Sequence, residues 1–259
     1  MTNQLMNQNI NHSVCAWCYP DMNLDELCVA ANEIGITGID LVGPEGWPTL
    51  KKHGLYSPMC NGAEISLTEG FNDPQHHAQL LDNYAKMIPL VAVAGYTNLI
   101  CFSGNHNGMD DETGLANCVA GIKPLLPIAQ KYNVVLVMEL LNAKIDHPDY
   151  QCNKTPWGVE LAKRLDSLNF KLLYDIYHMQ IEEGDIIRTI QQNHQYIAHY
   201  HTGGVPGRNE IDQTQELNYP AIMEAIKNTG FKGFVAQEFI PIQSNKIASL
   251  AKAVQICDV

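Results

Sequence analysis

Short apolar segments recur along the chain, and each is followed by a longer stretch in which apolar residues return every three or four positions. The short segments are rich in β-branched and aromatic residues, a pattern typical of buried strands. They predict eight strands, at residues 13–17, 38–42, 55–60, 97–103, 134–140, 171–176, 196–201 and 234–239. Pro58 makes the third of these the weakest, because proline cannot donate a hydrogen bond to a sheet.

The longer stretches have the periodicity of helices, and several begin after Asp or Asn, carry proline near the first position and end before glycine. They predict helices at residues 24–34, roughly 44–53, 74–94, 112–132, 156–165, 184–193, 219–228 and 244–256. Strands that alternate with helices predict right-handed crossovers and a parallel sheet. Eight such units favour an α/β fold, a single-domain (β/α)8 TIM barrel over residues 13–259, after a disordered polar lead at 1–12.

An open doubly wound sheet is the alternative architecture. It would normally carry a glycine-rich loop after its first strand, and the segment CAWCYPDMN at that place is not one. The barrel is therefore the predicted fold.

Composition narrows the classes of function. The chain of 259 residues is 46% hydrophobic and 17% charged, with no run near the roughly 20 apolar residues that a membrane helix requires. Its N-terminus has neither a basic nor an apolar signal region, so we expect a cytoplasmic protein with no membrane partner. A formal charge of −12 disfavours binding to nucleic acid. Without a secretory signal the eight cysteines are expected to be reduced thiols, and the lone CxxC at Cys15 and Cys18 lacks the second pair of a zinc site.

Four predicted strands in the second half of the chain end in an ionisable residue where an apolar one would be usual. Glu139, Asp175, His201 and Glu238 occupy these positions, about one strand–helix unit apart. In a barrel the carboxyl ends of the strands meet at one face, where active sites form. Three carboxylates there would repel one another unless a cation joined them. We therefore expect a divalent metal, Mg²⁺, Mn²⁺ or Co²⁺ from the oxygen and imidazole ligands, with Zn²⁺ possible.

Two further histidines lie close to these positions in sequence. His199 precedes His201 by two residues and would point to the same side of the strand, but His201 is nearer the tip and is the predicted ligand. His178 follows Asp175 by three residues and is expected in the loop that leads to the next helix. The alternative to a functional role is a surface histidine at the start of that helix.

The motifs MELLN, YDIYHMQ, HYHTGGVPGR, ELNYP and AQEFIP follow one another between about residues 134 and 241. In this order they resemble the hydroxypyruvate isomerase family, a branch of the xylose-isomerase-like TIM barrels. The chain departs from bacterial members of that branch, which often have Gln in place of His201. It also departs from the related sugar epimerases, which have Glu where this chain has Ile145.

The resemblance implies roles for individual residues. It implies that Glu139, Asp175, His201 and Glu238 hold the metal, and that Glu139 and Glu238 form the proton-transfer pair. It also implies that His178 and Arg208 hold substrate oxygens, and Arg208 could pair with a substrate carboxylate. A surface ion pair is the alternative reading for Arg208. Aromatic residues that could line the substrate are Trp17, Trp47, Trp157 and Phe239, although packing is the more usual use of such residues.

The leading hypothesis is a metal-dependent isomerase of a small α-hydroxycarbonyl compound, with hydroxypyruvate to tartronate semialdehyde as the candidate reaction. A metal-stabilised enediolate would carry the proton transfer. A ketose 3-epimerase or a dehydratase would use the same scaffold, and a non-catalytic sugar-binding barrel is the alternative from another class. The expected partners are a keto acid or sugar substrate and a second copy of the chain in a homo-oligomer.

Overall fold

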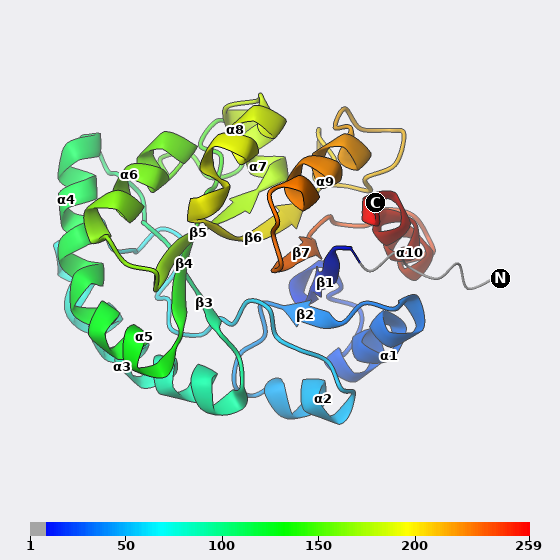
Figure 1. Cartoon of the computed structure of the whole chain (residues 1–259), viewed down its shortest axis with the longest axis horizontal. Helices are drawn as coiled ribbons and strands as arrows, with labels where there is room; N and C mark the ends of the chain where they lie inside the picture. Colours follow the sequence, from blue (N-terminus) through cyan, green and yellow to red (C-terminus); the bar gives the residue numbers. More distant parts are fainter. Residues whose placement is uncertain (1–8) are drawn as a thin grey trace.

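Seven parallel strands form one curled sheet in the computed structural model, which describes residues 9–259. The strands are β1 (Asn11–Cys15), β2 (Gly38–Asp40), β3 (Asn98–Cys101), β4 (Val135–Glu139), β5 (Phe170–Asp175), β6 (Ile197–Thr202) and β7 (Phe234–Gln237). Their order in the sheet is β2-β1-β7-β6-β5-β4-β3. Figure 1 shows them around the centre of the molecule with the helices outside. The predicted barrel is confirmed.

The segment at residues 55–60 differs from its prediction, because it is not a regular strand. It makes isolated bridges from Tyr56 to Gly38 and from Cys60 to Leu99. The backbone N–H of Leu41 donates to the oxygen of Met59 (2.8 Å), and the N–H of Ile100 donates to the oxygen of Cys60 (2.9 Å). Proline at position 58 removes one donor and interrupts continuous pairing. The segment still lies between β2 and β3, and it closes the barrel at the place of the eighth strand.

The helices surround the sheet as the periodicity predicts. They are α1 (Leu24–Ile34), α2 (Trp47–Lys52), α3 (Pro74–Ala94), α4 (Asp111–Ile122), α5 (Leu126–Tyr132), α6 (Thr155–Leu165), α7 (Ile176–Glu182), α8 (Ile186–Asn193), α9 (Tyr219–Asn228) and α10 (Lys246–Cys257). The first has a capping box, in which the side chains of Asn23 and Glu26 bond each other's backbone N–H, and it ends at left-handed Gly35.

Two predictions about helices are wrong in detail. The helix expected over 112–132 divides at a 3-10 turn (Lys123–Leu125), because Pro124 and Pro127 lack the N–H that a continuous helix needs. Residues 176–182 form the short helix α7 directly after β5, where a loop was expected. His178 therefore lies in the first turn of a helix.

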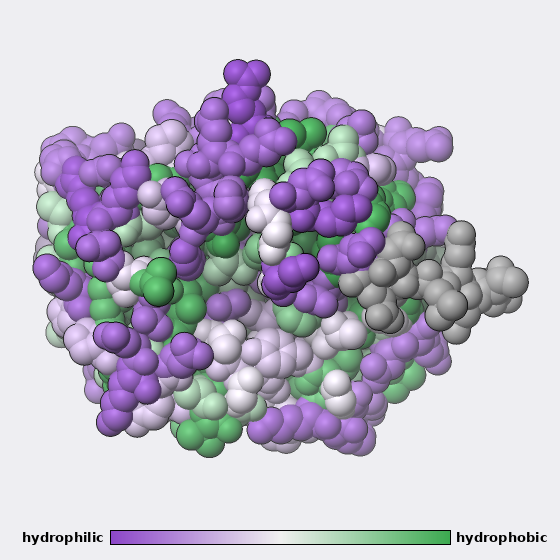
Figure 2. Space-filling view, in the orientation of Figure 1, coloured by the Kyte–Doolittle hydropathy of each residue, from purple (hydrophilic) through white to green (hydrophobic). Residues whose placement is uncertain are grey.

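The N-terminal residues, the cysteines and the helix lengths can be compared with the remaining predictions. Residues 1–8 of the expected lead lie outside the described residues, and Asn11 and His12, which were assigned to the lead, belong to β1. All eight cysteines are buried and free. No helix within residues 9–259 is long and apolar enough to cross a membrane. Figure 2 shows polar side chains over most of the face in view, with apolar residues in small separate groups.

Candidate active site and metal centre

Four neighbouring parallel strands deliver the four ionisable residues that the sequence singles out. Glu139 and Asp175 are the last residues of β4 and β5, His201 is the next-to-last residue of β6, and Glu238 directly follows β7. Because the strands are parallel and adjacent, these residues reach one face of the barrel. Their potential ligand atoms all lie within 4.8 Å of one another, and all four residues are buried.

The imidazole of His201 faces two of the carboxylates through Nδ1. This atom lies 2.7 Å from Oε2 of Glu238 and 3.3 Å from Oε1 of Glu139. Despite these distances Nδ1 makes no well-oriented hydrogen bond within the described residues. Burial alone would lower the pKa of His201, but Glu238, Cys15 and Asp40 outweigh it and raise this pKa well above its ordinary value. The neighbouring carboxylates thus favour the protonated, positively charged form of His201.

Two carboxyl groups of the cluster respond to the same surroundings in opposite ways. Burial raises the pKa of both Asp175 and Glu238. For Glu238 the positive charges of Arg208 and His201 outweigh burial and hold its pKa well below the ordinary value. For Asp175 burial outweighs the attraction of Arg208, and its pKa rises to about 8. The buried carboxyl groups therefore compete for the available positive charge.

Arg208 supplies part of that charge from the loop after β6. Its Nη2 lies 3.1 Å from Oδ2 of Asp175 and also donates to Oε2 of Glu238. The guanidinium is flanked by the rings of Trp17 and Tyr177, with centroids at 5.2 and 5.1 Å. The loop folds back tightly enough for the N–H of Arg208 to donate to the oxygen of Gly204 (2.8 Å). With 13% of its side-chain surface exposed, Arg208 is thus a largely buried partner of the cluster rather than a residue of a surface ion pair.

His178 lies behind Arg208, with no exposed side-chain surface. Its Nε2 is 3.0 Å from Nη1 of Arg208, and its Nδ1 is 2.6 Å from Nδ2 of Asn142. Its backbone N–H donates to Oδ1 of Asp175, which caps α7. Burial, followed by the charge of Arg208, lowers the pKa of His178 well below its ordinary value, so the imidazole is neutral. The reading of a surface histidine is wrong.

Two residues near the cluster were not singled out correctly from the sequence. Asp40 ends β2 with no exposed surface, 2.5 Å from Nε2 of His199 and 3.4 Å from Nε2 of His201. Burial raises its pKa, but the two histidines outweigh burial and lower it to about 2. The signal was present, because the segment GID ends in a carboxylate as the four later strands end in ionisable residues. The adjacent His199 contacts Asp40 rather than the carboxylate cluster.

Trp17 is the second such residue, since the sequence grouped it with three other aromatic residues that could line the substrate, although packing is their more usual use. Its Nε1 donates to Oε1 of Glu238 at 2.8 Å, so it bonds the cluster directly. By contrast, Nε1 of Trp47 donates to the backbone oxygen of Val42, and Nε1 of Trp157 to that of Asp111. The three tryptophans thus differ in the partner of the indole N–H, which the sequence alone does not show.

A cavity of about 520 Å³ opens over Arg208. Its lining residues include Trp17, His147, Tyr177, Pro206, Arg208 and Ile240. Ile145, which is 68% exposed, stands at this cavity. The space suits a small polar ligand that approaches the guanidinium from solvent.

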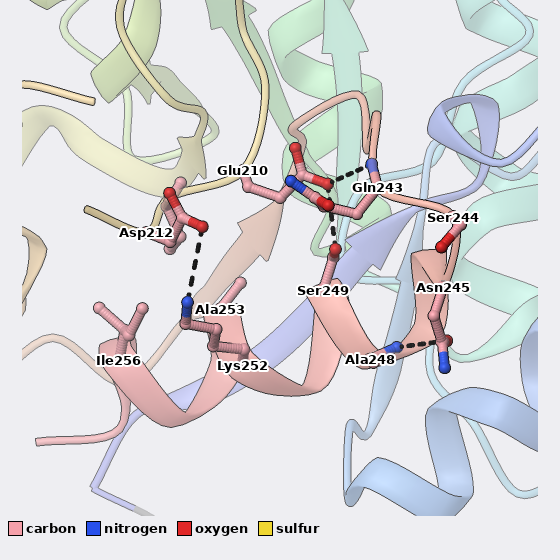
Figure 3. Close-up of a pocket in the computed structure, with 11 residues that line it drawn as sticks. Glu210, Asp212, Gln243, Ser244, Asn245, Ala248, Ser249, Lys252, Ala253 and Ile256 are labelled. Atoms are coloured by element: carbon pink, nitrogen blue, oxygen red, sulfur yellow. Dashed lines mark hydrogen bonds and ion pairs between the residues drawn. The ribbon is translucent and has the colours of Figure 1, made fainter. Parts of the chain in front are cut away.

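A second cavity of about 400 Å³ lies beside α10 (Figure 3). Its carboxylates are already paired. Glu210 accepts from the N–H of Gln243 and from Oγ of Ser249, both at 3.0 Å, and Lys252 lies 3.5 Å from Asp212. These contacts connect the loop after β6 to α10 and to the residues that precede it. The polar groups of this cavity therefore stabilise the fold.

Comparison with known proteins agrees with this architecture. The family model described as a xylose isomerase-like TIM barrel matches residues 29–255. The 2-oxo-tetronate isomerase of Cupriavidus necator is 34% identical over 113 residues, which are 44% of this chain and 43% of that protein. The hydroxypyruvate isomerase of Escherichia coli is 28% identical over 169 residues, 65% of each chain. These matches span less than two thirds of either relative's length.

Among solved structures, an AP endonuclease of family 2 from Brucella melitensis superposes with a TM-score of 0.83 at 22% identity. The superposition covers 94% of this chain and 98% of that one. At this identity the likeness concerns the fold. The match of the family model over most of the sequence shows that the chain belongs to the xylose isomerase-like TIM barrel family.

Proposed function

We propose that this protein is a divalent-metal-dependent isomerase of a small α-hydroxycarbonyl substrate, with hydroxypyruvate to tartronate semialdehyde as the leading candidate reaction. The convergence of Glu139, Asp175, His201 and Glu238 within 4.8 Å at the carboxyl ends of four strands carries the proposal. The names of the two relatives, a 2-oxo-tetronate isomerase and a hydroxypyruvate isomerase, support this class of reaction.

The donor set fits a hard divalent cation. Three carboxylates and one imidazole suit Mg²⁺, Mn²⁺ or Co²⁺, and Zn²⁺ also accepts such ligands. The buried Nδ1 of His201, which lacks a well-oriented hydrogen bond within the described residues, has the character of a ligand atom. When bound, the metal would polarise the substrate carbonyl and neutralise charge that develops on the adjacent oxygens.

Proton transfer is assigned to Glu139 and Glu238. Both carboxylates approach Nδ1 of His201, at 3.3 and 2.7 Å, so both reach the same centre. One would take the proton from the hydroxyl-bearing carbon and the other would return a proton to the neighbouring carbon, while the hydroxyl proton passes to the former carbonyl oxygen, so that no proton is gained or lost overall. Trp17 holds one oxygen of Glu238 by a hydrogen bond of 2.8 Å and so fixes the orientation of this carboxylate.

Substrate binding is assigned to Arg208, with His178 behind it. Arg208 lies at the cavity of about 520 Å³ and presents a planar guanidinium that suits a carboxylate. His178 contacts Nη1 of Arg208 at 3.0 Å, so it helps to fix the guanidinium. A keto acid could then place its carboxylate toward Arg208 and its carbonyl toward the cluster.

The second candidate is a ketose 3-epimerase, and the size of the cavity favours it. About 520 Å³ is more room than a three-carbon acid fills, and a longer polyol could extend past His147 and Tyr177. The same glutamates would take and return a proton at a single carbon. The substrate that reacts separates the two candidates.

The test begins with metal analysis of the purified protein, followed by an NMR screen of small keto acids and ketoses in D₂O with Mg²⁺, Mn²⁺ or Co²⁺. We expect metal-dependent conversion of hydroxypyruvate with incorporation of deuterium. Glu139→Gln and Glu238→Gln should each lower kcat by about 100- to 10,000-fold, whereas Glu224→Gln, on the exposed face of α9, should be neutral. Turnover of a ketose alone would favour the epimerase. Ligand binding without turnover in any variant or in the wild type would indicate a sugar-binding barrel.

A further inference from the structure

We infer that Asp40 is a positioning residue for His201, holding a proton on Nε2 of the imidazole and thereby directing Nδ1 toward the carboxylates of the metal centre. The inference rests on the proposed metal-dependent function. It concerns a residue outside the cluster of Glu139, Asp175, His201 and Glu238, on a strand in the other half of the barrel.

The two nitrogens of His201 face different surroundings. Nδ1 lies 2.7 Å from Glu238 and 3.3 Å from Glu139, whereas Nε2 lies 3.4 Å from Oδ2 of Asp40. Sγ of Cys15 is also near Nε2, at 3.8 Å. Of these two neighbours of Nε2, Asp40 is the carboxylate, and a carboxylate oxygen is a much stronger hydrogen-bond acceptor for an imidazole N–H than the sulfur of a cysteine.

The contact crosses the interior of the barrel. Asp40 ends β2 and His201 lies on β6, and two strands, β1 and β7, separate these in the sheet. Both side chains have no exposed surface. Both oxygens of Asp40 are buried without a well-oriented hydrogen bond among the described residues, so the imidazoles of His199 and His201 are the groups that balance its charge. A carboxylate in this place needs such partners.

The contact between Asp40 and His201 decides which nitrogen of the imidazole is free to bind a metal. A neutral imidazole carries one N–H, and the nitrogen without it offers the lone pair that a metal binds. A carboxylate beside Nε2 keeps the proton there, fixes the ring and makes Nδ1 the ligand atom. Outer partners of this kind commonly contribute 10- to 100-fold in metal affinity.

His199 provides the matched control. It shares the same carboxylate, with Nε2 at 2.5 Å from Oδ2 of Asp40, but it does not belong to the group of Glu139, Asp175, His201 and Glu238. If Asp40 served only as half of a buried ion pair, removal of either partner would have similar effects. If Asp40 positions His201, the two variants differ.

The experiment titrates the metal-stripped, full-length protein with Co²⁺ by calorimetry and records the visible absorption spectrum of the bound ion. We expect Asp40→Asn to weaken Co²⁺ binding by about 10- to 100-fold and to change the spectrum at saturation. His199→Gln should lower Tm while it leaves the affinity within about 3-fold and the spectrum unchanged. Wild-type affinity and spectrum in Asp40→Asn, or equal losses of affinity in both variants, would overturn the inference.

A second measurement needs no variant and covers the case in which Asp40→Asn does not fold. Long-range ¹H–¹⁵N NMR of the Zn²⁺-loaded wild type reports which nitrogen of His201 carries the proton. A proton on Nε2 is expected, and a proton on Nδ1 with the metal on Nε2 would contradict the inference. If the wild type binds no divalent ion, the proposed function itself fails, whereas metal binding with an unaffected Asp40→Asn removes only the role of Asp40.

Discussion

The guanidinium of Arg208 lies 3.1 Å from the carboxylate of Asp175, and the same Nη2 also donates to Glu238. Two of the proposed metal ligands therefore share one cation that belongs to the chain. The rings of Trp17 and Tyr177 flank this cation and limit its access to water. Without metal, the guanidinium of Arg208 is thus the main fixed positive charge that offsets the repulsion between these buried carboxylates.

Replacement of Arg208 by Gln should destabilise the metal-free protein by about 3–5 kcal/mol, because it removes a buried cation that Asp175 and Glu238 share and leaves His201 to balance their charge. Added Mn²⁺ should restore more stability to the variant than to the wild type. Thermal unfolding with EDTA and with Mn²⁺ measures both effects. Arg164→Gln is the control, since Arg164 pairs with Glu112 and Glu160 on the surface. An unchanged Tm of Arg208→Gln in EDTA would contradict the prediction.

Replacement of Trp17 by Phe should lower kcat by about 10-fold with little change in KM. The variant keeps a ring beside Arg208 but loses the Nε1–H bond to Oε1 of Glu238, and a hydrogen bond to a charged group contributes about 1.5–3 kcal/mol. Steady-state kinetics on the substrate found by the screen measures the change. Trp47→Phe removes a buried bond to the oxygen of Val42 and should affect stability without kcat. Equal effects on kcat would show that the bond of Trp17 is not specific to the site.

The four residues at the carboxyl ends of β4 to β7 could be predicted from the sequence. Each ends an apolar run, and parallel strands with regular crossovers bring such ends to one face. The structure brings Glu139, Asp175, His201 and Glu238 together as expected. Asp40 ends its strand in the same way and was overlooked. The contact of Trp17 with Glu238 was not accessible, because Trp17 lies in the 3-10 turn after β1 and its place in the sequence does not distinguish it from Trp47 and Trp157.

The hydrophobic pattern did not predict the local structure of two segments, residues 55–60 and helix α7. The apolar run at 55–60 resembles a strand, yet Pro58 reduces it to isolated bridges. Helix α7 begins without a separate glycine, proline or Asn signal, because its N-cap is Asp175, a residue whose charge already pointed to the metal centre. One side chain thus ends a strand, caps a helix and faces the cluster.

Replacement of Gly70 by Ala should destabilise the fold by about 1–3 kcal/mol, the usual range for an overpacked interior. An added Cβ would lie 2.3 Å from the backbone N of Gly104 and 2.5 Å from the oxygen of Phe102, and backbone atoms cannot move aside. The neighbouring N–H of Asn72 donates to the oxygen of Ser103 (2.8 Å), so the two segments are joined here. Urea unfolding measures the loss. Gly43→Ala should cost less, because the atoms nearest to its added Cβ belong to the flexible side chain of Glu45.

His12, on β1, should make the protein less stable as the pH falls from about 6.5 to about 4. Burial lowers the pKa of His12 from its ordinary value near 6.5 to about 4, although Asp258 opposes the shift. In this window the unfolded chain binds a proton at His12 that the folded chain excludes. The stability is therefore fully present above pH 6.5 and is lost on acidification, by up to about 1.4 kcal/mol per pH unit.

His12→Gln removes this contribution, so its free energy of unfolding should fall less steeply with acid than that of the wild type, whatever its value at pH 7. Urea unfolding at several pH values between 7 and 4, in EDTA to exclude metal binding, gives the two slopes. His76→Gln, which alters a histidine on α3 whose side chain is 26% exposed, is the control. If His12→Gln and the wild type lose stability in parallel, the imidazole of His12 is charged inside the folded barrel, and Asp258 rather than burial decides its state.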